Sequence, residues 1–299
     1  MPTVIILLSA YNGERYIEEQ LRSLTVQEGV RYKIIVRDDG SSDATPDILR
    51  SWQERGDITW YRGENMGWAW SFMHLLTHAP EADYYAFCDH DDIWQPDKLS
   101  VAVKMLQQED SCIKLYCSNL YEYKEGKIVG EVYSEIPVIN IYTAMVKAAT
   151  AGCTMVLSRG LQQKVANNQP KYLFAHDYWV YQVAAATGCV IYDPKPHILY
   201  RQHVDNQIGY KSSFTEIWKR RLKQLRTLFA QHQREWAARE LLSCHGDEMS
   251  DEHRKAVAKM AYYKKNPLRR LSLFFDKRYS MGHFSNNFWL RLRIILGCV

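Results

Sequence analysis

Three carboxylates and one imidazole stand side by side at Asp89-His90-Asp91-Asp92, directly after the apolar run 84–88. A short apolar run of this kind is typical of a buried strand. At the exposed end of such a strand, Asp89 and Asp91 can both reach one cation, and Mg²⁺ and Mn²⁺ prefer carboxylate oxygens. A polar turn before a helix is the alternative, because Asp is favoured near helix N-termini. A turn explains one acid better than three. We therefore expect a metal site and assign only Asp92 to the turn.

Three further runs early in the chain also end in polar side chains. These runs are 4–8, 33–36 and 58–61, and each leads through a turn into an amphipathic helix. Strands that alternate with helices over short connections favour an α/β fold with a mainly parallel sheet. Ligands bind beyond the carboxyl ends of the strands in such sheets. We therefore expect one edge of the sheet to present Ser9 and Tyr11, Asp38 and Asp39, Asn65 and Gly67, and Asp89 and Asp91.

The hydrophobic pattern changes after the first 110 residues. Composition and turn residues predict strands at 113–117, 121–123, 128–129, 152–157, 190–192 and 197–200. The first three are expected to form a β-rich insert. A helix is predicted between Phe174 and Gly188, with Asp177 near its start. The fold class is therefore α/β, with a mixed, mainly parallel sheet that is flanked by helices.

Composition indicates a folded protein with a large core, because 46% of the 299 residues are apolar and 13% are aromatic. The seven cysteines are scattered without a CxxC pair and lie mostly in apolar runs, which favours buried, reduced thiols over disulfides or a zinc site. Neither a basic leader nor an apolar run long enough to span a membrane is present. We expect a cytoplasmic protein.

Charge divides the chain into two parts. Residues 1–210 hold 19 Lys and Arg against 26 Asp and Glu, whereas residues 211–299 hold 19 against 8. The second part has the pattern of basic amphipathic helices with Trp, Phe and Leu, which suits peripheral contact with an anionic membrane surface. A helical appendage with solvated charges, or a contact with a second subunit, is the alternative. Nucleic acid is not an expected partner, because no RRM, KH or zinc-finger signature accompanies the charge.

Four motifs in order resemble the family 2 glycosyltransferases of GT-A (Rossmann-like) fold. They are Ser-Ala-Tyr-Asn at 9–12, Asp-Asp-Gly-Ser-Ser-Asp at 38–43, Asn-Met-Gly at 65–67 and Asp-His-Asp-Asp-Ile-Trp at 89–94. The last motif and His-Asp-Tyr-Trp at 176–179 resemble most the bacterial rhamnosyltransferases of surface polysaccharide synthesis. The resemblance covers residues 2–210 and implies a nucleotide-sugar-binding half (1–110), an acceptor-side half (111–210) and a basic helical C-terminal region (211–299).

The resemblance also implies roles for the residues that match the motifs. Tyr11 would stack on the nucleotide base, Asp39 would hydrogen-bond the imide edge of that base, and Ser9, Asn65 and Gly67 would complete the nucleotide-sugar site. Asp89 would face the ribose or a metal-bound water.

Three other residues would serve the metal and the chemistry. Asp91 would ligate the divalent metal, and Asp177 stands where the family keeps its catalytic base. His203 would touch the diphosphate or the metal, although an ordinary loop histidine explains this residue equally well.

The implied activity is inverting, metal-dependent transfer of a sugar, with L-rhamnose from dTDP-rhamnose expected, onto a hydroxyl of a saccharide acceptor that is lipid-linked. A metal stabilises the departing diphosphate and one carboxylate activates the acceptor, which gives inversion at the anomeric carbon. A UDP-hexose-dependent transferase and a non-catalytic carbohydrate-binding protein stay open as alternatives. A nucleotidyltransferase or nicotinamide dehydrogenase is disfavoured, because the first strand is not followed by a glycine-rich phosphate loop.

Overall fold

Alternating strands and helices build the first half of the chain, as the hydrophobic pattern predicts. The computed structural model describes residues 1–149, 151–202 and 233–299. Seven strands form the larger sheet, in the spatial order β10 (Cys189–Asp193), β6 (Lys114–Ser118), β9 (Val156–Ser158), β4 (Tyr84–Asp89), β1 (Thr3–Ala10), β2 (Arg31–Asp38) and β3 (Thr59–Arg62). All neighbouring pairs are parallel except those of β9, which runs antiparallel to β4 and β6. The predicted mixed, mainly parallel α/β sheet is confirmed.

The register of the central strands brings the predicted polar ends together. Ser9 of β1 lies beside Asp89 of β4 and beside Arg37 of β2, and Ala10 lies beside Asp38. Parallel strands in this register end at the same level, so their carboxyl-terminal loops open onto one edge of the sheet.

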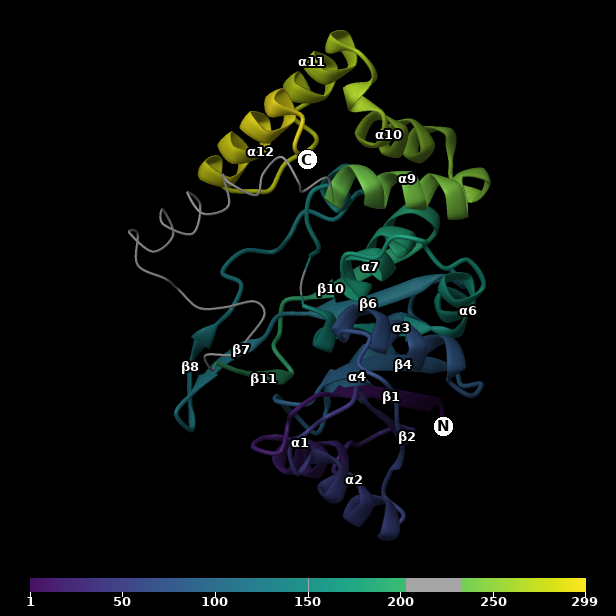
Figure 1. Cartoon of the computed structure of the whole chain (residues 1–299), viewed down its shortest axis with the longest axis vertical. Helices are drawn as coiled ribbons and strands as arrows, with labels where there is room; N and C mark the ends of the chain where they lie inside the picture. Colours follow the sequence, from purple (N-terminus) through teal and green to yellow (C-terminus); the bar gives the residue numbers. More distant parts are fainter. Residues whose placement is uncertain (150, 203–232) are drawn as a thin grey trace.

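The smaller sheet lies beside the larger one and extends away from it (Figure 1). Its spatial order is β5 (Ile93–Trp94), β11 (Ile198–Arg201), β7 (Tyr121–Lys124) and β8 (Lys127–Glu131). The predicted β-rich insert is therefore only partly right, because β6 (Lys114–Ser118) belongs to the larger sheet, where it pairs with β9 and β10. Partners that distant in the chain are chosen by tertiary packing, which local composition does not encode.

The strand predicted at 152–157 is wrong in its first half. Gly152–Thr154 form a short 3₁₀ helix, and only Val156–Ser158 continue as β9. The Thr154 hydroxyl donates a hydrogen bond to the Ala151 carbonyl at 2.8 Å, which closes this turn locally. Thr is a good strand former, but its hydroxyl can satisfy backbone groups in a turn instead.

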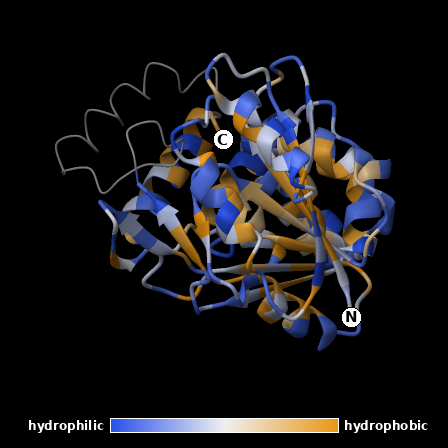
Figure 2. Ribbon diagram, turned by 90° about the horizontal axis from the view of Figure 1, so that it is seen from below, coloured by the Kyte–Doolittle hydropathy of each residue, from blue (hydrophilic) through white to orange (hydrophobic). Residues whose placement is uncertain are grey.

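Helices cover both faces of the larger sheet. On β1, Ile5 and Leu7 point into one apolar layer, whereas Val4, Ile6 and Leu8 point into the other. This alternation explains why the strand is apolar throughout. Apolar strands run through the middle of the molecule in Figure 2. The helices that precede residue 203 are α1 (Ile17–Leu24), α2 (Thr45–Glu54), α3 (Trp68–His78), α4 (Lys98–Gln107), α5 (Ile141–Ala144), α6 (Arg159–Asn167) and α7 (His176–Thr187).

The described part of the basic C-terminal region is helical, as predicted. Its helices are α9 (Gln233–His245), α10 (Asp251–Ala261), α11 (Pro267–Phe275) and α12 (Phe284–Leu296), with short 3₁₀ turns at Gly246–Glu248 and Tyr263–Lys265. They stack beyond α7 at one end of the molecule (Figure 1). None of the helices in the described ranges combines the length and the apolar character needed to cross a membrane.

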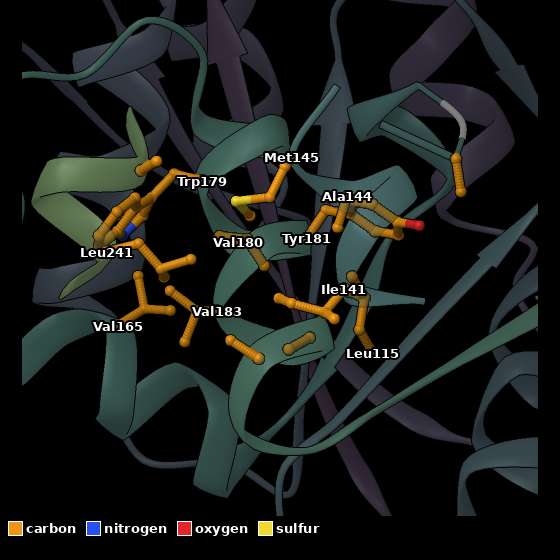
Figure 3. Close-up of a cluster of buried hydrophobic side chains, with 14 of the residues drawn as sticks. Leu115, Ile141, Ala144, Met145, Val165, Trp179, Val180, Tyr181, Val183 and Leu241 are labelled. Atoms are coloured by element: carbon orange, nitrogen blue, oxygen red, sulfur yellow. The ribbon is translucent and has the colours of Figure 1, made fainter. Parts of the chain in front are cut away.

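The C-terminal helices share an apolar layer with the sheet. Leu241 of α9 is buried beside Trp179 and Val183 of α7 (Figure 3), and both helices belong to the layer that also contains Ile5 and Leu7 of β1. Apolar side chains buried together in this way contribute jointly to the stability of the fold. The helices are thus packed onto the α/β body across a continuous core.

Replacing Leu241 by Ala should therefore destabilise the whole protein. We expect the free energy of unfolding to fall by about 2–5 kcal/mol, because the substitution leaves a cavity in a shared core. Leu268→Ala is the matched control, since Leu268 is 78% exposed on α11 and should cost less than about 0.5 kcal/mol. Urea unfolding followed by circular dichroism measures both. Equal stability of the two variants would contradict the shared core.

Candidate functional site

One cavity of about 1270 Å³ collects the predicted site residues at the carboxyl ends of the central strands. Residues from both halves of the chain line it, and those predicted from the sequence are Ser9, Tyr11, Asp39, Asn65, Gly67, Asp89, Asp91 and Asp177. His203 lies outside the described residues. The residues that were expected at separate strand ends, and the acid expected on a later helix, thus face one space.

Asp39 is held by a buried network at the end of β2. Its carboxylate pairs with the guanidinium of Arg37 and accepts hydrogen bonds from the backbone N–H groups of Met66 and Gly67, each at 3.0 Å. Gly67 has a φ of 80°, a left-handed conformation that glycine adopts without steric cost. Asp39 therefore ties the loop that follows β3 to the end of β2, and this fixes one wall of the cavity.

Arg37 is a functional residue that the sequence analysis missed. It is 1% exposed, and besides Asp39 it donates to the Ser71 hydroxyl at 3.0 Å and to the Glu64 carbonyl at 2.9 Å. Ser71 in turn shares a 2.6 Å hydrogen bond with Ser9. The signal was an arginine placed between the apolar run 34–36 and the acids that end the strand, where a buried charge needs a partner.

Tyr11 contrasts with this buried network. Its side chain is 47% exposed at the cavity, directly after β1. An exposed aromatic ring on a short loop is available for stacking on a planar group.

Asp89 lies in an unfavourable electrostatic environment at the end of β4. Burial, followed by the negative charges of Asp91 and Asp177, raises the pKa of Asp89 to about 8. Carboxylates that disfavour one another's ionised form in this way are stabilised by a divalent cation, which prefers such oxygen ligands. The donor set at the cavity therefore fits Mg²⁺ or Mn²⁺, with Asp89 and Asp91 as the residues that would hold it.

Asp92 is fully buried, so its assignment to a simple turn is wrong. It lies behind the cavity, where its carboxylate accepts a hydrogen bond from the Arg201 backbone N–H at 3.2 Å. The Arg201 side chain also donates to the Asp91 carbonyl at 2.9 Å. Asp92 and Arg201 thus connect the acidic loop to the end of β11, and they hold the backbone of that loop at Asp91.

Cys153 joins this buried layer. Its sulfur and one oxygen each of Asp89 and Asp92 lie within 4.8 Å of one another, a grouping that could in principle hold a metal. However, burial and then the charges of Asp92 and Asp89 raise the pKa of the Cys153 thiol well above its usual value. The thiol is then protonated and can donate hydrogen bonds to the neighbouring carboxylates. Cys153 and Asp92 do not line the cavity, so they support Asp89 from behind.

Lys98 is a buried cation that interacts electrostatically with this layer. Its ammonium group is buried 3.5 Å from the ring centroid of Trp94, and burial lowers the pKa of Lys98 to about 7. The negative charge of Asp92 acts in the opposite direction. A cation over an aromatic face and near a buried carboxylate partly offsets the cost of burying that acid.

Asp177 lies in the first turn of α7 and faces the same cavity. Burial raises the pKa of its carboxyl to about 6, although the Tyr178 backbone N–H donates to it at 2.7 Å. A carboxylate with a pKa in this range is suited to take a proton near neutral pH. Gly152 lets the chain approach this site, because a Cβ there would lie 3.1 Å from the Asp177 Cβ.

His176 provides the apolar surroundings of Asp177. Its ring stacks on Phe72 at 4.1 Å and meets the edges of Trp68 and Phe87, and burial lowers the pKa of His176 to about 3. The imidazole is therefore neutral. It shields Asp177 from water without supplying a positive charge that would stabilise the carboxylate.

The far side of the cavity was not predicted from the sequence. It is lined by residues that follow α5, by residues of α9 and α12 and by one residue before α12, namely Val146, Lys147, Ala148, Gln233, Arg234, Met281 and Arg293. Three of them are cations. They lie in segments far apart in the chain, so only the tertiary fold reveals that they face one space.

The comparisons with known proteins agree with this architecture. The model of the glycosyl transferase family 2 matches residues 5–147. The chain is 31% identical over 229 residues to the dTDP-rhamnosyl transferase RfbG of Shigella flexneri, across 71% of this chain and 77% of that protein. It is 32% identical over 179 residues to the UDP-Glc:alpha-D-GlcNAc-diphosphoundecaprenol beta-1,3-glucosyltransferase WfaP of Escherichia coli, across 60% of this chain and 68% of that protein.

Solved structures show the same fold at lower sequence identity. TarS 1–349 of S. aureus in complex with UDP-GlcNAc superposes with a TM-score of 0.58 at 17% identity, over 91% of this chain and 73% of that one. The mannosyltransferase PcManGT of Pyrobaculum calidifontis, in complex with GDP-Man and Mn²⁺, superposes with a TM-score of 0.54 at 19% identity, over 98% of this chain and 85% of that one. The resemblance seen in the motifs is confirmed: the chain belongs to glycosyl transferase family 2 and is a glycosyltransferase of GT-A fold.

Proposed function

We propose that this enzyme transfers L-rhamnose from dTDP-rhamnose, with inversion and with the aid of a divalent metal, onto a hydroxyl of a saccharide acceptor. The observation that carries the proposal is that the carboxylate pair Asp89 and Asp91 lines the same cavity as Asp177 at the start of α7. The choice of rhamnose is supported by the similarity to a dTDP-rhamnosyl transferase. In this proposal the acceptor is lipid-linked. The WfaP relative supports this part, because its name contains a diphosphoundecaprenol acceptor.

The donor would occupy the strand-end side of the cavity. Tyr11 would stack on the base, and Asp39 would accept a hydrogen bond from the base imide, since its position is already fixed by Arg37. Ser9, Asn65 and Gly67 would line the rest of the nucleotide-sugar site. Asp89 and Asp91 would hold the metal, with His203 as a further proposed ligand. A bound divalent cation would supply Lewis-acid stabilisation of the charge on the leaving diphosphate.

Asp177 would act as the base. Its carboxylate takes the proton of the acceptor hydroxyl while that oxygen forms a bond to the anomeric carbon, and the bond from this carbon to the diphosphate oxygen breaks. One base on the face opposite the leaving group gives inversion. A β-linked rhamnose donor therefore yields an α-rhamnoside.

Replacing Asp177 by Asn should remove transfer and spare donor binding. The amide keeps the shape of the side chain but cannot accept the proton, so we expect kcat to fall by about 10²–10⁴-fold. Calorimetry should show unchanged affinity for dTDP with Mg²⁺. The matched control is Asp110→Asn, because Asp110 is exposed and lies outside the cavity.

The pH profile of the wild type gives a second test of this role. The raised pKa of Asp177, about 6, means that the carboxyl becomes protonated as the pH falls through that value. The base is then lost, so kcat should decrease below about pH 6 and level off above it. Normal turnover by the Asn variant, or a flat profile between pH 5 and 8, would place the base elsewhere.

Replacing Asp91 by Asn should weaken the binding of the nucleotide only when metal is present. We expect a loss of about 10–100-fold in the affinity for dTDP with Mg²⁺ or Mn²⁺, because one carboxylate ligand is missing. Calorimetry with each metal and with EDTA measures this difference. If wild type and variant bind dTDP equally under all three conditions, Asp91 does not hold a metal.

A UDP-hexose donor is the second candidate, and the similarity to the UDP-Glc-dependent WfaP is the observation that favours it. Metal-dependent hydrolysis of dTDP-rhamnose, UDP-glucose and UDP-GlcNAc by the purified enzyme discriminates the two. Absence of hydrolysis with every nucleotide sugar would favour the non-catalytic carbohydrate-binding alternative.

The C-terminal region 211–299 is proposed to contact the inner face of the cell membrane. In its described part, α11 and α12 expose Leu268, Phe275, Phe284 and Phe288, by 57–88% of their surface. Residues 233–299 also hold 13 Lys and Arg against 7 Asp and Glu. Exposed aromatic side chains beside basic residues suit an anionic lipid surface.

Replacing Phe284 and Phe288 by Ser should weaken this contact. Each buried Phe contributes about 1.5–3 kcal/mol, so co-sedimentation with phosphatidylglycerol vesicles should decrease at least tenfold. The matched control replaces Ile136 and Val138 by Ser, since both are exposed outside the C-terminal region. Equal sedimentation of both double variants, or equal binding to phosphatidylcholine vesicles, would argue for a second subunit as the partner.

A further inference from the structure

Three cations line the side of the cavity that faces away from the nucleotide strands. Lys147 follows α5, Arg234 lies in the first turn of α9, and Arg293 lies in the last turn of α12. They come from three segments that are far apart in the chain. The donor chemistry proposed above uses none of them.

Backbone carbonyls hold two of these side chains in place. The Nε of Arg234 donates to the Val146 carbonyl at 2.8 Å, and the Nζ of Lys147 donates to the Met281 carbonyl at 3.2 Å. Arginine carries five N–H donors in a rigid fork, so the Arg234 bond to Val146 leaves several donors for a ligand.

The charges of this cluster are not balanced by ion pairs. Lys147, Arg234 and Arg293 take part in none of the salt bridges of the described ranges, in contrast to Arg239 and Lys264 nearby, which both pair with Glu235. Only the charge of the exposed Glu135 acts on Lys147. A protein that keeps cations half-buried without carboxylate partners has an uncompensated electrostatic cost.

Two of the guanidinium groups also repel each other. Burial, followed by the positive charge of Arg234, lowers the pKa of Arg293 below its usual value. Like charges that are brought together at a cavity wall indicate that the site is complementary to an anion, since a bound anion removes the repulsion. Guanidinium groups are especially suited to phosphate, because their fork matches two of its oxygens.

The position of the cluster indicates which substrate carries the anion. Asp177 lies at the start of α7, and α7 packs against α5 and α9. Lys147 follows α5, and Arg234 belongs to α9. α7 also packs against β6 and β10, which lie at the opposite end of the larger sheet from β1 and β2. An anion at the cluster therefore lies on the acceptor side of the base.

We propose that Lys147, Arg234 and Arg293 bind the diphosphate through which the acceptor saccharide is joined to an isoprenoid lipid. This inference rests on the proposed transfer to a lipid-linked acceptor and assigns the residues that recognise its linkage. A diphosphate diester carries two negative charges, which three cations can accommodate. Apolar surface for the first isoprene units is available beside the cluster, because Val146 and Met281 line the same wall and the exposed Phe284 follows Met281 closely in the chain.

The test uses farnesyl diphosphate as the probe and the full-length enzyme saturated with dTDP and Mg²⁺, so that the donor site is filled. Calorimetry should show that farnesyl diphosphate binds and that farnesol binds at least tenfold more weakly. The double variant Arg234→Gln/Arg293→Gln should lose about tenfold or more of the affinity for the diphosphate, because two charge-assisted contacts are removed. Arg234→Lys/Arg293→Lys should recover part of it. Arg50→Gln, an exposed arginine on α2, is the matched control.

Separate measurements distinguish failure of this inference from failure of the proposed function. Metal-dependent hydrolysis of dTDP-rhamnose reports on the donor site and should be unchanged in the Gln variant. Thermal unfolding checks that the variant is folded, and Lys147→Gln provides a second, single substitution with the same expected direction. The inference is overturned if dTDP prevents farnesyl diphosphate from binding, if the Gln variants bind it as the wild type does, or if they lose donor hydrolysis. The last result would assign the cations to the donor diphosphate.

Discussion

The mutual repulsion of carboxylates at the end of β4 is the constraint on which the site depends. Asp89 is held beside Ser9 by the register of two central strands, and the adjacent loop places Asp91 at the same cavity. Helices cover both faces of the sheet at β1 and β4. The end of β4 therefore cannot move to relieve the repulsion. The fold thus keeps an unfavourable cluster of acids in position, which fits the proposed binding of a divalent cation at this strand end.

A second layer of buried polar residues makes this arrangement rigid. Asp92 and Cys153 support Asp89 from behind, and Arg37 does the same for Asp39 at the end of β2. Asp92, Cys153 and Arg37 do not line the cavity themselves. They hold the carboxylates of Asp89 and Asp39, which do. Such support reflects a general requirement, because a side chain that meets a substrate must be held in place by other side chains behind it.

The sequence predicted the elements that depend on local signals. Apolar runs followed by Asn, Asp and Gly located the four strand ends, and the register then followed from the parallel fold. It did not predict that Gly152–Thr154 form a 3₁₀ helix, or that β6 joins the larger sheet, since both depend on distant contacts. Buried charges such as Arg37 were missed for the same reason. A lone arginine or lysine has the same appearance in a sequence whether it is solvated or faces a cavity.

The cavity itself draws on parts of the chain that have different local patterns. One wall comes from loops after parallel strands, whereas the opposite wall comes from the segment after α5 and from the basic C-terminal region. Asp177 lies between the two walls at the start of α7, and the buried face of α7 packs against α9 through Trp179 and Leu241 (Figure 3). The position of the proposed base is therefore set from both sides. For this reason the C-terminal helices are part of the architecture of this cavity, whatever surface their exposed faces contact.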